Sequence, residues 1–153
     1  MYILDTSVWI HVGRNHPPDI FATLWGHIED AIARGEIRSP DEVLRELEEG
    51  HDTLAPALAG KVGLFVPLDA GLQAAATEVL ARCPQLVDPD STRNRADPFV
   101  VALARQLQGT VVTQERPRRG ATGRPKIPDA CVIMAMNPSM DWFDFLRRAG
   151  WRL

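Results

Sequence analysis

The chain opens with a short apolar run, residues 2–4, that stops at an aspartate and two hydroxyl residues, Asp5-Thr6-Ser7. An apolar run of this length, followed at once by polar residues, predicts a buried strand. A carboxylate at the end of a buried strand is costly unless it is paired or binds a cation. Because open α/β sheets bind ligands at the carboxyl ends of their strands, we expect Asp5 to belong to a functional site there.

Short apolar runs alternate with helical patterns along the rest of the chain. Further strands are predicted at residues 36–38, 64–66 and 110–113. Helices are predicted after residue 5 to about 12, from 19 to 35, from 39 to 50, from 69 to about 80, from 97 to 107 and from 141 to 148. A broken helical piece is expected at 52–60, and residues 128–136 favour a helix. This alternation predicts an α/β protein, a three-layer α/β/α fold around a mostly parallel sheet, in a single domain spanning residues 1–153.

Two helix starts carry specific signals. In Ser39-Pro40-Asp41-Glu42, the serine is expected at the N-cap and Glu42 three residues on, as in a capping box. Asp97-Pro98 also has the form of an N-cap followed by a first-turn proline. The helix that Asp97 opens is apolar nearly all round, which is typical of a central, buried helix.

Charge, cysteine, histidine and hydrophobic content limit which partners, cofactors and cellular settings are expected for the chain. The net charge of −3 means that a nucleic acid would have to be held by a local basic patch or by metal ions. The two cysteines, Cys83 and Cys131, are far apart, which favours a reducing, cytoplasmic setting without a disulfide framework. The four histidines are scattered singly, so structural zinc is not expected. We expect neither a signal peptide nor a membrane span, because the chain has no basic n-region and no apolar run of sufficient length.

Four acidic residues fall where predicted elements begin, end or face the mouth of the sheet: Asp5, Glu46, Asp97 and Glu115. Glu46 is expected one turn into the helix that follows the second strand. Strand ends and the helix starts that follow them converge on one edge of a parallel sheet. Carboxylates gathered there repel one another unless cations neutralise them, and sites made only of oxygen ligands favour Mg²⁺ or Mn²⁺. Such metals activate water in phosphoryl-transfer chemistry.

The same segments resemble the motifs of the PIN-domain nucleases. The matching stretches are MYILDTSVWI, VLRELEEG, RADPFVVALA and VVTQE, in this order along most of the chain. The C-terminal segments KIPDAC and DFLRRAGW are similar to an uncharacterised PIN-like bacterial branch, related to the VapC-like toxins of toxin–antitoxin pairs. The chain departs from many relatives in carrying glutamate as the fourth acid and a longer insertion at residues 116–126.

The resemblance implies a Mg²⁺-dependent (or Mn²⁺-dependent) endoribonuclease, the toxin of a toxin–antitoxin pair. Asp5, Glu46, Asp97 and Glu115 would be its catalytic residues and metal ligands. The partners implied are an RNA substrate, an antitoxin protein and a second copy of the chain in a homodimer, in the cytoplasm and away from membranes.

Several neighbouring side chains have candidate roles beside these acids. The hydroxyls of Thr6 and Thr113 are expected to help at the site. The insertion at residues 116–126 is a basic loop. Its Arg118, Arg119 and Arg124 are candidates for RNA binding, because arginine pairs phosphates bidentately. The charges of such a loop are often merely solvated.

Plainer interpretations remain open. Taken alone, Asp5 could simply form a hydrogen bond in a turn, and Glu46 could be a solvent-exposed glutamate on a helix surface. A non-catalytic PIN-like module that binds RNA or protein is the alternative function. A phosphatase-like hydrolase with Asp5 as nucleophile is disfavoured, because no second aspartate follows two residues on and no glycine-rich phosphate loop follows the first strand.

Overall fold

A parallel sheet in the order β3-β2-β1-β4 lies at the centre of the computed structural model, which describes residues 1–91, 94–120 and 122–152. Its strands are β1 (Tyr2–Leu4), β2 (Ile37–Pro40), β3 (Phe65–Val66) and β4 (Thr110–Val112). In the register, Tyr2 of β1 lies opposite Ile37 of β2 and Thr110 of β4. The mostly parallel sheet expected from the sequence is therefore confirmed.

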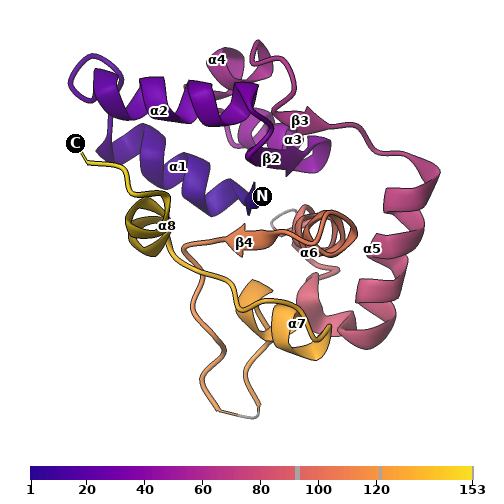
Figure 1. Ribbon diagram of the computed structural model, residues 1–153. Coiled ribbons are helices and arrows are strands. Elements are labelled where there is room, and N and C mark those ends of the chain that lie inside the picture. The colour runs from indigo at the N-terminus through magenta and orange to yellow at the C-terminus, as the bar shows by residue number, and fades with distance from the viewer. Residues whose placement is uncertain (92–93, 121, 153) are drawn as a thin grey trace.

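Helices cover the sheet (Figure 1). They are α1 (Thr6–Asn15), α2 (Ala22–Ala33), α3 (Asp41–Glu49), α4 (Ala55–Ala59), α5 (Ala70–Arg82), the 3₁₀ turn η1 (Pro84–Leu86), α6 (Asp97–Gln106), α7 (Ile127–Ile133) and α8 (Trp142–Ala149). Helix α6 contacts β1, β2 and β4 and packs along α5, whereas α2 contacts β2. Helices flank the sheet, in agreement with the predicted three-layer α/β/α arrangement. None of the described helices is long and apolar enough to cross a bilayer.

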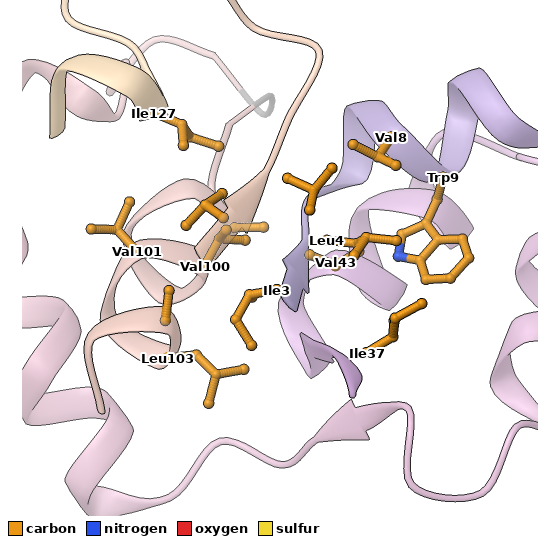
Figure 2. Close-up of a cluster of buried hydrophobic side chains, with 14 of the residues drawn as sticks. Ile3, Leu4, Val8, Trp9, Ile37, Val43, Val100, Val101, Leu103 and Ile127 are labelled. Atoms are coloured by element: carbon orange, nitrogen blue, oxygen red, sulfur yellow. The ribbon is translucent and has the colours of Figure 1, made fainter. Parts of the chain in front are cut away.

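The core surrounds β1, whose consecutive side chains point to opposite faces of the sheet. Figure 2 shows Ile3 on the side of α6, near Val100 and Leu103, and Leu4 on the side of Val43 and Trp9. All six of these side chains are buried in one hydrophobic cluster. Helix α6 is buried nearly all round because it lies between the sheet and α5. Its first residue, Asp97, is thereby held at the edge of the core.

The predicted elements are present, with shifted ends. The helix expected from residue 19 begins at Ala22, because the carbonyl of Pro17 accepts hydrogen bonds from the backbone N–H groups of Ile20 and Phe21 and forms a turn there. The helix favoured at 128–136 is α7, which runs from Ile127 to Ile133, and Asp141 caps α8 through the N–H of Asp144. Residues 92, 93 and 121 lie outside the described residues, and the last of them belongs to the basic insertion at 116–126.

The predicted capping box at Ser39 is wrong. Ser39 lies inside β2, and Pro40 is the N-cap of α3 without a side-chain bond. The Ser39 hydroxyl is fully buried, donates to the carbonyl of Leu4 at 2.7 Å and accepts from the indole N–H of Trp9 at 3.0 Å. The serine therefore joins β2 to β1 and α1 rather than starting a helix.

Candidate active site

Asp5 lies between the end of β1 and the start of α1, which it caps. Its Oδ1 accepts the backbone N–H of Val8 at 3.0 Å, and its Oδ2 accepts the hydroxyl of Thr113 at 2.8 Å. The hydroxyl of Ser7 lies 2.8 and 2.9 Å from the two oxygens. Burial raises the pKa of Asp5 from 3.8 to about 7, opposing these hydrogen bonds, and the nearby charge of Glu115 raises it further. The carboxyl is thus both a cap and a strongly perturbed group at the sheet edge.

Glu46 joins helix α3 to this edge. Its Oε2 accepts the hydroxyl of Thr6 at 2.6 Å, and its Oε1 accepts the backbone N–H of Ala96 at 3.0 Å. Thr6 belongs to the first turn of α1, and Ala96 immediately precedes α6. Glu46 is therefore not an ordinary exposed helix glutamate, because its carboxylate contacts the starts of two other helices.

Asp97 is the first residue of α6 and is 7% exposed. Burial raises its pKa from 3.8 to about 9, and the charges of Glu115, Asp5 and Glu46 raise it further, while Lys126 lowers it. Within the described part of the chain, its Oδ2 has no hydrogen-bond partner. The expected N-cap role is wrong, since Ala96 occupies that position without a side-chain bond. Asp97 is instead a buried carboxyl whose ionisation the other three acids oppose.

Glu115 completes the group just beyond β4. Its backbone N–H donates to the hydroxyl of Thr113 at 3.0 Å, and its Oε2 accepts the N–H of Ile127 at 2.9 Å. Its Oε1 lies 3.5 Å from Nζ of Lys126. The fourth acid is therefore linked to the Asp5 side through Thr113 and to the start of α7 through Ile127.

Two residues in contact with these acids were not assigned to the site from the sequence. Ser7 binds Asp5 and also accepts the N–H of Gln114 at 3.0 Å, which joins α1 to the segment after β4. Its place beside Asp5 and Thr6 in the sequence was a usable signal. Lys126 comes back to Glu115 only through the path of the loop, for which the sequence holds no comparable local signal.

Glu42 lies one turn before Glu46 on α3 and is 7% exposed. Neither of its carboxylate oxygens has a hydrogen-bond partner among the described residues, and Oε1 lies 3.7 Å from Nη1 of Arg45. The reach to the backbone N–H of Ser39 that a capping box requires is therefore absent from the described structure.

The basic loop orients its arginines differently from one another. Arg124 donates from Nε and Nη2 to the carbonyls of Gln85 and Leu86 at 3.1 and 3.0 Å, and its Nη1 lies 3.3 Å from Asp88. Arg118 donates to the carbonyl of Gly123 at 3.4 Å and is exposed, as is Arg119. Arg124 ties the loop to η1, whereas the RNA-binding role of the three arginines stays a prediction.

The donor chemistry of the acidic group fits a hard divalent cation. All four side chains offer carboxylate oxygens, and the buried Oδ2 of Asp97 has no partner. As the side chains stand, no three His, Cys, Asp or Glu residues of the described ranges are placed to hold one ion together. Glu46 and Glu115 are instead turned toward the N–H groups of Ala96 and Ile127. The set fits a metal by ligand type, but it is not preassembled around one.

Four carboxyl groups on separate segments, coupled at the carboxyl edge of a parallel sheet, define the class: an α/β protein with an acidic site. The chain belongs to the family described as "Domain of unknown function (DUF4411)", which it matches over residues 2–153. No curated protein matches it. A solved structure, "Structure of FitAB bound to IR36 DNA fragment", is similar over 75% of this chain and 85% of that chain, at 20% identity and a TM-score of 0.47.

Proposed function

We propose that the protein is a Mg²⁺- or Mn²⁺-dependent endoribonuclease. Its catalytic residues and metal ligands would be Asp5, Glu46, Asp97 and Glu115. The observation that carries the proposal is the buried carboxyl of Asp97, whose Oδ2 has no hydrogen-bond partner among the described residues and which feels the charges of the other three acids. A protein that gathers four acids there loses stability unless something neutralises them. A divalent cation with oxygen ligands would do so, and the motif resemblance to PIN nucleases supports the same choice.

A bound metal would supply an activated water and would stabilise charge on the leaving oxygen. The residues of the chain have supporting tasks. Ser7 and Thr113 donate to Asp5 and so hold its carboxylate in one orientation. Thr6 and the N–H of Ala96 do the same for Glu46. Because α6 is buried, it fixes Asp97 at the edge of the core.

The toxin role, an antitoxin partner and a homodimer belong to the same proposal. They rest on the resemblance of the four motifs and of the C-terminal segments to VapC-like toxins. The most direct support would be a small reading frame encoding a candidate antitoxin beside the gene. Co-expression of its product should relieve any growth arrest that the present chain causes.

The experiment is a cleavage assay on single-stranded RNA labelled at both ends. Cleavage should require Mg²⁺ or Mn²⁺, stop in EDTA and fall at least about 100-fold in Asp97→Asn. Asp19→Asn, which changes an exposed aspartate, is the matched control. Persistent cleavage in EDTA would exclude the metal mechanism. Metal-independent RNA binding without cleavage would favour the non-catalytic module.

A further inference from the structure

The loop between β4 and α7 returns to the acidic site at Lys126. In Figure 1 it leaves β4, extends beyond the helices and comes back to α7. Asp129 closes its base, since Oδ2 accepts the backbone N–H groups of Arg118 at 3.0 Å and Lys126 at 2.8 Å. The next N–H, that of Ile127, donates to Glu115. The backbone of Lys126 is thus fixed on both sides.

The side chain of Lys126 points its charge at the acids. Nζ lies 3.5 Å from Oε1 of Glu115, and the side chain is 37% exposed. Its charge also acts on Asp97, against the effect of the three carboxylates. The ammonium group therefore lies beside Glu115, acts on Asp97 and retains access to solvent and to a ligand.

Three of the four arginines of the loop are directed elsewhere. Arg118 contacts a carbonyl within the loop, Arg124 contacts Gln85, Leu86 and Asp88, and Arg116 lies 3.7 Å from Asp141. Among the contacts of the described residues, Lys126 is the cation of this loop that meets the acidic group. The other lysine of the chain, Lys61, pairs with Glu29 far from the site.

The position of Lys126 affects how many divalent ions the acidic site can bind. One divalent ion neutralises two of the four carboxylates, and the ammonium group neutralises a third. One negative charge then remains at the site, and a second divalent ion would be repelled by both the first ion and the ammonium group of Lys126. A lysine is a compact point charge with three donors, which suits an ammonium group that contacts a phosphate oxygen.

We propose that Lys126 is the second cation of the acidic site: it takes the place of a second metal ion and contacts a phosphate oxygen of the RNA. This inference rests on the proposed function. If it is correct, one divalent ion binds per chain. Removing the ammonium charge should tighten that ion about threefold to tenfold, because two positive charges no longer repel across the site. The same change should slow cleavage about 100-fold, because charge on the phosphate loses a fixed partner.

The test compares Lys126→Gln with Lys61→Gln as the matched control. Mn²⁺ binding to the RNA-free protein is followed by electron paramagnetic resonance, and RNA cleavage is measured separately at saturating Mn²⁺. In Lys126→Gln we expect tighter Mn²⁺ binding, entry of a second ion and a lower kcat. Lys126→Arg, which keeps the charge, should keep the wild-type Mn²⁺ stoichiometry and recover part of the rate. Lys61→Gln should change neither quantity.

The opposing movements of metal affinity and rate separate this role from a structural one. If both fall together, or if Mn²⁺ binding and kcat stay at wild-type values, the role of Lys126 is refuted while the metal-dependent nuclease stands. Two bound Mn²⁺ ions in the wild-type chain would also refute it. If the wild-type chain binds no Mn²⁺ and cleaves no RNA, the proposed function itself fails.

Discussion

Replacing Asp97 with asparagine should change how the stability of the metal-free protein depends on pH. In the folded protein the pKa of Asp97 is raised to about 9 by burial and by its three acidic neighbours, whereas its ordinary value is 3.8. Between these two values the folded chain holds a proton that the unfolded chain has released. The resulting stability is fully present below pH 3.8 and is lost as the pH rises toward 9.

The size of the effect follows from proton linkage. One extra proton bound on folding lowers the free energy of unfolding by about 1.4 kcal/mol per pH unit. From pH 5 to pH 8, Asp97 alone should therefore cost about 4 kcal/mol, a large part of the roughly 5–15 kcal/mol typical of a domain. Asp5, with its pKa raised to about 7, adds to the slope up to that pH. Because asparagine cannot ionise, the pH dependence of the free energy of unfolding in Asp97→Asn should come from Asp5 alone.

The assay is urea unfolding in EDTA at pH 5, 6, 7 and 8, with Asp19→Asn as an exposed control. The wild-type and control chains should lose stability steeply, and the curve of Asp97→Asn should be flatter by about 1.4 kcal/mol per pH unit. Mg²⁺ at pH 8 should stabilise the wild-type chain more than the variant, because it binds the ionised carboxylates. A wild-type stability that is flat with pH, or parallel slopes in all three chains, would refute the electrostatic account of the site.

Four further substitutions separate effects on stability from effects on activity or RNA binding. Ser39→Ala should lower the free energy of unfolding by about 1–3 kcal/mol in urea titrations, because it leaves the buried indole N–H of Trp9 unpaired; unchanged stability would contradict that reading. Glu46→Gln should cut cleavage at least about 100-fold while the melting temperature in EDTA stays near wild type, and normal cleavage would remove Glu46 from the site. Arg119→Ala should weaken RNA binding and reduce its salt slope by about one. Arg124→Ala should reduce that slope less than Arg119→Ala, because the Arg124 guanidinium already binds two carbonyls, and equal effects of the two would show that the loop acts as one surface.

The architecture could be predicted because its signals are local and agree with one another. Short apolar runs between amphipathic stretches indicated the strands, and an all-round apolar pattern indicated the burial of α6. The start of α3 shows where local signals fail. Ser-Pro-Asp-Glu is a good capping sequence, yet Ser39 is bound by partners that lie 30 and 35 residues away in the chain, Trp9 and Leu4. Two long-range hydrogen bonds of Ser39 outweighed its local preference for a helix N-cap. A short stretch of sequence cannot predict this, because it does not include both Ser39 and its partners.

The acidic group was predictable for a related reason: Asp5 and Glu115 follow strands and Asp97 starts a helix, and a parallel sheet brings those positions to one edge. Glu46 lies within α3 and was assigned by the motif resemblance. Lys126 has no such anchor. Its approach to Glu115 depends on Asp129, which closes the base of the loop by accepting the backbone N–H groups of Arg118 and Lys126 at once. Loop length and composition indicate a basic insertion, but they do not state which of its charges returns to the site. The carboxylate of Asp129, which lies beyond the loop, fixes the backbone of Lys126 and so brings Lys126 to Glu115. The basic run alone does not determine which of its cations reaches the acids.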